Sequence, residues 1–189
     1  MAAYLSPIER PRGLFLRLVF FFARRQFGTV VTPLRVFSAR MPLAFTSFYG
    51  KLPRLDKKLQ LPSQTTEIIR ERVASINTCR FCMDATRWYA MKTNNTARFD
   101  ALEEYQTSAL FTDAERAALD YATELTRNKE VSPGTFARLT RYYNEREICD
   151  IVWLVASEHL YNMTNIGLNI GSDGLCAMRP QRATRTASA

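Results

Sequence analysis

Helix-start signals constrain the fold of this chain more than any other feature of its sequence. Thr112 is followed three residues later by Glu115, and Asn144 is followed at the same spacing by Glu147. In this capping-box pattern each side chain binds the backbone N–H of the other residue, which satisfies N–H groups that a helix start leaves unpaired. We therefore predict that a helix begins at each of these positions.

The apolar residues around these signals have helical rather than strand spacing. Residues 112–128 place an apolar stripe at i, i+3/i+4 spacing, and residues 148–168 form a long apolar stretch that ends near Gly167. Ser132-Pro133 indicates a further helix start, because proline fits a first turn where its missing N–H costs nothing. No hairpin turn lies between alternating apolar and polar runs. The sequence thus predicts an all-α fold.

An apolar segment near the N-terminus, LFLRLVFFFA at residues 14–23, looks like the core of a signal peptide. However, Arg17 interrupts it, Arg24 and Arg25 follow at once, and no small-residue cleavage site comes after it. The segment is also about half as long as a helix that spans a bilayer. Four cysteines are too few for a disulfide-stapled secreted scaffold, so we interpret them as thiols of a reducing compartment. We predict a cytoplasmic protein with no membrane span.

Charge divides the chain into three parts. Residues 1–60 carry eleven Lys and Arg against two Asp and Glu, residues 61–178 are mildly acidic, and residues 179–189 add three arginines. We predict an N-terminal basic and apolar helical arm (1–60) packed on a helical core (61–178), followed by a disordered tail (179–189). Such an arm could contact nucleic acid or anionic lipid, but a solvated helix face or an arm lying on a partner subunit is the simpler interpretation. No helix-turn-helix pattern indicates a nucleic-acid partner.

The strongest chemical signal is the cysteine pair in the stretch NTCRFCMDAT, residues 77–86. Asn77 and Thr78 are good caps between two helical patterns, so we place Cys79 and Cys82 in the first turn of a helix. Unpaired N–H groups and the positive end of the helix dipole stabilise a thiolate there. The two-residue spacer also brings both sulfurs onto one face, close enough for a disulfide.

This pair fits three interpretations: a redox dithiol, two packed core residues, or half of a zinc site. A zinc site needs four ligands, and the remaining candidates, Cys149, Cys176 and His159, show no second paired spacing. We therefore predict neither a metal nor a cofactor, and the redox and packing interpretations both stay open.

The segment from Glu67 to Cys82 resembles the motif of the alkylhydroperoxidase D-like, or carboxymuconolactone decarboxylase-like, all-helical family. That motif is a glutamate, eleven residues, C-x-x-C, and a histidine four residues after the second cysteine. FTDAERAALDYATELTR and NEREICDIVWLVASEHLYNMTNIGLNIGSDGLC also resemble later helices of the family. The resemblance covers roughly residues 40–178, and the basic arm is similar to an extension of a subgroup that lacks the histidine. It implies an alkylhydroperoxidase D-like helical bundle with an N-terminal basic helical arm.

The resemblance also implies roles for individual residues. Cys82 would be the peroxide-attacking thiolate, Cys79 the resolving thiol, and Glu67 a distal base in a proton relay. The substrate would be a hydroperoxide or a disulfide, the reductant a redoxin-type partner, and the assembly a homo-oligomer, which an apolar arm in need of burial also favours. Thr86 stands where the family has its histidine. Threonine can donate and accept a hydrogen bond, but it does not take up and release a proton near neutral pH as an imidazole does, so we predict a weak peroxidase that still cycles as a dithiol.

Two further residues are candidate auxiliary groups beside Thr86. Arg87 could reach a substrate carboxylate or pair with Glu67, although a solvated or salt-bridged arginine is the simpler interpretation. His159, the chain's single histidine, fits a hydrogen-bonded core or interface position better than a replacement acid. The missing motif histidine also motivates an alternative function: a non-catalytic helical oligomerisation or small-ligand-binding protein on the same fold.

Overall fold

A computed structural model describes residues 2–177, and within that range the chain forms helices and turns but no strand. The all-α prediction is therefore confirmed. The α-helices are α1 (Leu14–Phe27), α2 (Pro42–Ala44), α3 (Leu52–Asp56), α4 (Ser63–Ile76), α5 (Arg80–Thr93), α6 (Thr96–Asp100), α7 (Asp113–Asn128), α8 (Pro133–Leu139) and α9 (Glu145–Gly167). The π-helices are η1 (Leu34–Ser38) and η2 (Phe45–Tyr49), and the 3₁₀-helices are η3 (Leu102–Glu104) and η4 (Leu175–Ala177).

The predicted helix starts lie where the capping signals place them. Thr112 and Glu115 form a capping box at the start of α7, and Asn144 and Glu147 form another at the start of α9. These two pairs satisfy N–H groups at the starts of the two longest helices of residues 2–177. The Ser132 side chain caps α8 by accepting a hydrogen bond from the backbone N–H of Thr135.

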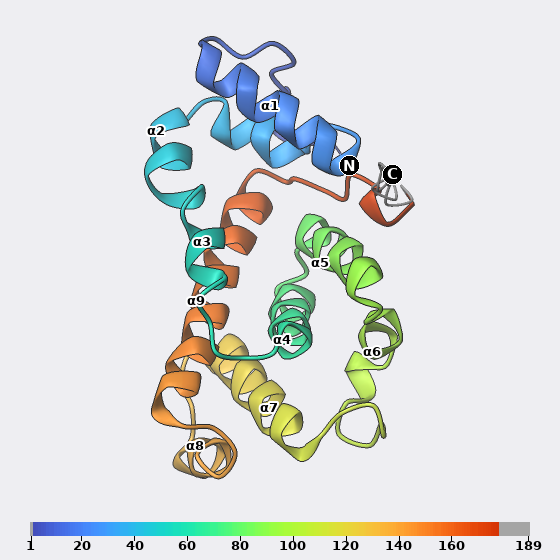
Figure 1. Cartoon of the computed structure of the whole chain (residues 1–189), viewed down its shortest axis with the longest axis vertical. Helices are drawn as coiled ribbons and strands as arrows, with labels where there is room; N and C mark the ends of the chain where they lie inside the picture. Colours follow the sequence, from blue (N-terminus) through green and yellow to red (C-terminus); the bar gives the residue numbers. More distant parts are fainter. Residues whose placement is uncertain (1, 178–189) are drawn as a thin grey trace, which may run out of the picture.

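Helix α4 is the centre of the core, and α5, α7 and α9 pack around it (Figure 1). Ile69 and Val73 of α4 are fully buried, and they share one hydrophobic cluster with Ala118 of α7 and with Ile151 and Leu154 of α9. The small alanines of α7 let its backbone approach α4 closely.

A second cluster covers another side of α4 and includes Ile68, Phe99 and Leu119. This arrangement places the end of α4 and the start of α5 beside α9.

The N-terminal segment contacts the core through several elements. Helix α1 lies at one end of the long axis of the molecule (Figure 1) and buries Leu16, Phe20 and Ala23. The ring of Phe27 lies 4.8 Å from that of Trp88 on α5. The domain limits 1–60, 61–178 and 179–189 stay predictions, and the tail lies outside the described residues. No helix within residues 2–177 is long and apolar enough to cross a bilayer.

Candidate active site

A sharp chain reversal between α4 and α5 creates the cysteine site. Thr78 adopts a left-handed backbone conformation with φ of 57°, and the N–H of Cys79 binds the carbonyl of Ala74. This reversal places Cys79 at the N-cap of α5, just before the first turn that we predicted for it, and Cys82 within the first turn. A disulfide joins the two cysteines, whose Cα atoms lie 5.3 Å apart.

The disulfide is almost completely enclosed. Cys79 is 1% exposed and Cys82 is 5% exposed, and both pack against Ala74 and Met83. Asn165 of α9, itself buried, donates a hydrogen bond from its amide Nδ2 to the Cys82 sulfur at 3.5 Å. A donor aimed at sulfur stabilises the thiolate over the neutral thiol. When the disulfide is reduced, the start of α5 and the Asn165 amide are both placed to stabilise a thiolate at Cys82.

A buried carboxyl group lies beside Thr86 on the same helix as Cys82. The Thr86 hydroxyl contacts the Glu71 carboxylate and also lies 2.9 Å from the Cys82 carbonyl oxygen. Arg87 donates from Nε to Glu71 at 3.1 Å and from a terminal nitrogen to Asp100 at 3.2 Å. Arg87 is thus a salt-bridged residue, as one of our two interpretations had it, but its partner is Glu71 rather than Glu67.

Glu71 has the electrostatic environment of a proton donor or acceptor. Its side chain is 2% exposed. Burial raises the pKa of its carboxyl, and the hydrogen bond from Thr86 and the charge of Arg87 oppose that rise only in part. A carboxyl group with a raised pKa holds its proton closer to neutral pH than an ordinary glutamic acid does.

Glu67, the glutamate of the motif spacing, lies one turn of α4 before Glu71. Its carboxylate accepts from the Thr93 hydroxyl at 2.8 Å and from the Asn95 amide at 3.1 Å. Both donors belong to the far end of α5 and the turn that follows, whereas the cysteines lie at the start of α5. The structure therefore places Glu71 on Thr86, whose hydroxyl also binds the backbone carbonyl of Cys82, and it places Glu67 on a different set of partners.

A chain of amide groups connects His159 to the same region. The amide nitrogen of Asn77 lies 3.3 Å from His159 Nδ1 and donates to Asn162 at 2.8 Å. Asn162 in turn donates to Glu158 at 2.7 Å. Burial lowers the pKa of His159, so its neutral form is favoured, and the half-buried ring is hydrogen-bonded as the simpler interpretation expected.

The negative charge of Glu158 is balanced by a partly buried arginine, Arg70. Arg70 of α4 donates to Glu158 at 3.0 Å and to Asp56 at 2.9 Å, and Asp56 also accepts from the Trp153 indole at 3.0 Å. Burial raises the pKa of Glu158, and the neighbouring Arg70 opposes the rise. Arg70 therefore holds α3, α4 and α9 together around a charge that has no access to water.

Replacing Arg70 by methionine is expected to lower the free energy of unfolding by about 3–5 kcal/mol, because it leaves Glu158 buried without a counter-charge. The loss should grow as pH rises above the ordinary glutamate range. In that pH range the folded variant retains a proton on Glu158 that its unfolded chain releases. The free energy of unfolding of the variant therefore falls as pH rises. Urea unfolding at several pH values measures both effects.

Two controls accompany this measurement. Arg141→Met removes an exposed arginine and should change stability by less than about 0.5 kcal/mol. The double variant Arg70→Met/Glu158→Met should be more stable than Arg70→Met alone, since no buried charge is left unpaired. A double variant less stable than the single one would show that packing, not the charge pair, dominates.

An aspartate on α5 fixes the C-terminal part of the described chain. Asp84 accepts from the backbone N–H groups of Leu175 and Cys176 at 2.9 and 3.0 Å, and from the Ser172 hydroxyl at 2.8 Å. Burial would raise the pKa of Asp84, but these hydrogen bonds outweigh it and lower the pKa. Burial and the adjacent Asp84 raise the pKa of the Cys176 thiol to about 11, which keeps that thiol protonated.

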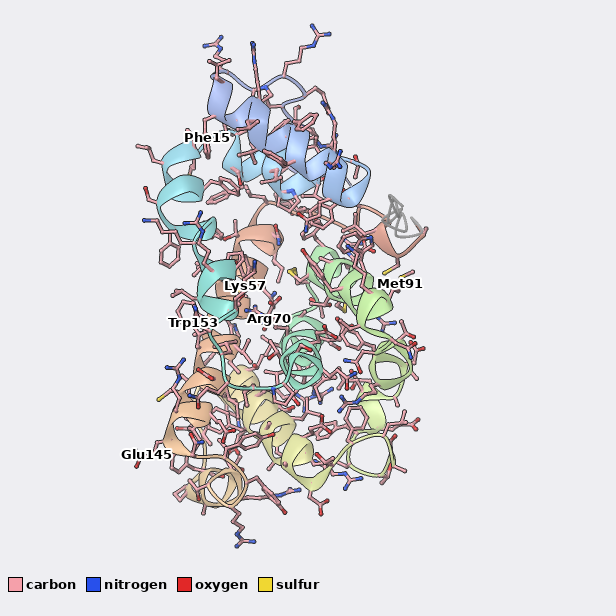
Figure 2. All side chains as sticks on the ribbon, viewed as in Figure 1. Phe15, Lys57, Arg70, Met91, Glu145 and Trp153 are labelled. Atoms are coloured by element: carbon pink, nitrogen blue, oxygen red, sulfur yellow. A yellow bond between two sulfur atoms is a disulfide. The ribbon has the colours of Figure 1, made fainter. Side chains whose placement is uncertain are left out.

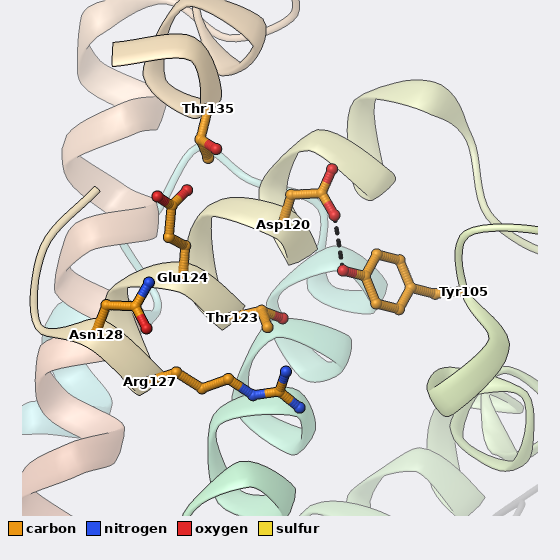
Figure 3. Close-up of a pocket in the computed structure, with 7 residues that line it drawn as sticks. All are labelled: Tyr105, Asp120, Thr123, Glu124, Arg127, Asn128 and Thr135. Carbon is orange, nitrogen blue, oxygen red and sulfur yellow. Dashed lines mark hydrogen bonds between the residues drawn. The ribbon is translucent and has the colours of Figure 1, made fainter. Parts of the chain in front are cut away.

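Two cavities lie apart from the cysteine pair. One has a volume of about 350 Å³ and is polar (Figure 3); it is lined by Tyr105, Asp120, Thr123, Glu124, Arg127, Asn128 and Thr135. The other, about 470 Å³, is lined by residues of the N-terminal segment and of the end of α9. Neither is lined by a cysteine. Residues 2–177 also contain no group of three or more His, Cys, Asp or Glu placed to hold a metal ion.

The architecture matches a known group of helical proteins. The sequence matches no protein-family model. The uncharacterised protein YnjA of Escherichia coli (strain K12) is 28% identical over 179 residues, which cover 90% of this chain and 94% of YnjA. The debrominase Bmp8, in complex with 2,3,4-tribromopyrrole, superposes with a TM-score of 0.79 at 23% identity and covers 94% of this chain and 96% of its own.

A structural match to an alkylhydroperoxidase AhpD core protein identifies the fold. This peroxidase-related protein of Ralstonia eutropha JMP134 superposes with a TM-score of 0.77 at 20% identity, and the alignment covers 93% of this chain and 95% of the other. This chain has the alkylhydroperoxidase D-like fold. The resemblance seen in the sequence is thus confirmed for the fold. At these sequence identities, structural similarity does not show that two proteins share an activity.

In this alkylhydroperoxidase D-like bundle, sequence reasoning missed Glu71, Asn162 and Asn165. A signal for the two asparagines was present, because Glu158, Asn162 and Asn165 recur at i, i+4 and i+7 on one face of an otherwise apolar helix. Polar residues on the buried face of a helix need partners, and here those partners include the Cys82 sulfur. No comparable pattern in the sequence indicated Glu71, because the motif spacing favours Glu67.

Proposed function

We propose that this protein is a thiol-dependent oxidoreductase whose working group is the Cys79–Cys82 dithiol. The observation that carries the proposal is the disulfide at the start of α5, with the Asn165 amide on the Cys82 sulfur. The helix start and the amide favour a thiolate at Cys82, and the paired cysteine lies ready to close the disulfide. Hydroperoxide reduction and disulfide exchange both use these features.

For a hydroperoxide the steps balance as follows. The Cys82 thiolate attacks the outer peroxide oxygen, the O–O bond breaks, and the leaving alkoxide takes up a proton to become an alcohol. Cys82 is then a sulfenic acid, which the Cys79 thiol attacks; the S–S bond forms and water leaves. A dithiol reductant of the redoxin class returns both cysteines to thiols by thiol–disulfide exchange.

We assign the acid–base role to Glu71, in place of the Glu67 that the motif spacing favoured, because Glu71 contacts the Thr86 hydroxyl one turn of α5 after Cys82. Glu71 is buried with a raised pKa and contacts the Thr86 hydroxyl, and Thr86 reaches the first turn of α5. A hydroxyl relays a proton by accepting one and donating another, yet it holds no charge of its own. We therefore expect slower proton transfer than a histidine would give.

The same dithiol chemistry extends to a second class of substrate. Because Bmp8 is a debrominase, a brominated pyrrole belongs in the assay beside hydroperoxides and disulfides. Two thiols supply the two electrons that convert a carbon–bromine bond into a carbon–hydrogen bond, with bromide released and a disulfide formed. A redoxin-type reductant, a homo-oligomeric assembly and a cytoplasmic location remain predictions.

The alternative, a non-catalytic helical module, is favoured by one observation. Both sulfurs are nearly inaccessible, and neither described cavity is lined by a cysteine. In that case the pair would serve only to pack the junction of α4 and α5. The alternative requires that the disulfide neither forms nor opens on the timescale of turnover.

Steady-state turnover separates the two functions. With a dithiol reductant and an organic hydroperoxide, a disulfide or 2,3,4-tribromopyrrole, the wild-type chain should consume at least one of the three catalytically. Cys149→Ser removes an exposed thiol outside the site and should retain the wild-type rate. If the double variant Cys79→Ser/Cys82→Ser turns over as fast as wild type, the proposed function is wrong.

A further inference from the structure

One face of α1 carries large apolar side chains that nothing in residues 2–177 covers. Leu14, Phe15, Leu18, Phe21 and Phe22 are between 51% and 83% exposed. They lie on one side of the helix, since successive positions are about 100° apart. The opposite side is already buried within the same chain. Packing of α1 against the rest of the chain therefore buries only part of the apolar side chains of this helix.

This outward face is held in a fixed direction. At the end of α1, Phe27 stacks near Trp88, and Gln26 donates to the Tyr89 hydroxyl at 3.0 Å. Gly28 ends the helix in a left-handed conformation. Figure 2 labels Phe15 near the edge of the molecule, at the end opposite α7 and α8. The helix that carries the apolar face is thus anchored to α5 and is not a free arm.

The charges around this face have one sign. Residues 1–60 carry eleven Lys and Arg against two Asp and Glu. Of the two acids, Glu9 is paired with Arg35, and Asp56 is bound to Arg70 of the core. Arg24 and Arg25, in the last turn of α1, make no ion pair within residues 2–177. Figure 2 shows nitrogen-tipped side chains extending outward at this end of the molecule.

We propose that the outward face of α1 docks on an anionic lipid surface. Phenylalanine and leucine on one face, flanked by arginine, are the composition of a helix that lies in the plane of a membrane interface. The apolar side chains enter the boundary of the acyl chains, and the arginines bind the anionic headgroups. The helix lies on the surface and does not span it, in agreement with the absence of a spanning helix from residues 2–177.

Charge decides between this partner and a second copy of the chain. Two copies joined through α1 would bring two strongly basic segments together, and like charges at an interface oppose association. An anionic bilayer presents the complementary charge. The mildly acidic core, residues 61–178, would then face away from the membrane. The proposal does not depend on the activity of the cysteine pair.

Co-sedimentation of the full chain with lipid vesicles tests the proposal. We expect binding to vesicles of phosphatidylglycerol and phosphatidylcholine, weaker binding to phosphatidylcholine alone, and weakening by salt. Leu18→Ala/Phe21→Ala/Phe22→Ala should reduce the partition coefficient by about a hundredfold, because three apolar side chains no longer enter the lipid. Arg24→Gln/Arg25→Gln should reduce it by roughly thirtyfold.

Matched controls and a mass measurement complete the design. Phe136→Ala and Arg141→Gln remove exposed residues of similar kind on the far side of the core and should leave the partition coefficient unchanged. Absence of binding to the anionic vesicles would overturn the proposal, as would full binding by the variant that lacks the apolar residues. A light-scattering mass of two chains that falls to 21.7 kDa in that variant would also overturn it, since a second copy would then cover α1.

Discussion

Serine at position 82 is expected to abolish peroxide consumption, whereas serine at position 79 should leave a single turnover. Cys82 is the cysteine that receives a hydrogen bond from Asn165, so its sulfur is the one stabilised as a thiolate. Without it no nucleophile attacks the peroxide oxygen. Without Cys79 the attack still occurs, but the sulfenic acid on Cys82 has no partner to form a disulfide.

Rapid mixing of reduced protein with a hydroperoxide distinguishes the two variants. Cys79→Ser should consume about one equivalent of peroxide and then stop, and Cys82→Ser should consume none. The exposed Cys149 supplies the control, because Cys149→Ser should cycle like the wild type. The opposite pattern, with a single turnover in Cys82→Ser, would exchange the roles of the two cysteines.

Glu71→Gln is expected to slow turnover by about a hundredfold, the lower end of what general acid–base catalysis contributes. The glutamine amide can keep the contact with Thr86, but it neither takes up nor releases a proton. The geometry is therefore retained while proton transfer is lost. Glu67→Gln is the matched control one helical turn away. It changes hydrogen bonds to Thr93 and Asn95 and should affect the rate only a fewfold.

The pH profile provides a second test of Glu71. Because burial raises the pKa of Glu71, the wild-type protein keeps a proton on this group above the ordinary glutamate range and loses it as pH rises further. A step that needs the protonated acid should therefore slow across that range, and the slope should be absent in Glu71→Gln. A larger loss in Glu67→Gln than in Glu71→Gln would return the role to the residue that the motif spacing indicates.

Local rules of helix formation explain why so much of the fold could be predicted. The capping boxes at Thr112 and Asn144 are interactions between residues three positions apart, so the sequence contains all the information they need. The position of the cysteines at a helix start follows from Asn77 and Thr78 in the same way. The exact reversal, with Cys79 at the N-cap, depends on the left-handed backbone of Thr78, which no spacing rule indicates.

The parts of the site that sequence reasoning missed depend on contacts between distant elements. Asn165 meets Cys82 only because α9 packs beside the junction of α4 and α5, across 83 positions of the chain. Glu71 and Glu67 lie on the same helix, and which of them reaches Thr86 depends on how α5 is set against α4. Helical periodicity gives the face of a residue but not its partner on another helix.

The central claim is that Cys79 and Cys82 exchange between dithiol and disulfide as the working cycle. Its most direct test is differential alkylation of the reduced protein, before and after one equivalent of hydroperoxide, read residue by residue by mass spectrometry. We predict that Cys79 and Cys82 lose their reactivity together and regain it with dithiothreitol, while Cys149 stays reactive throughout. If both cysteines of the pair remain alkylatable after the hydroperoxide, and also after a disulfide and after 2,3,4-tribromopyrrole, the proposed oxidoreductase function is contradicted.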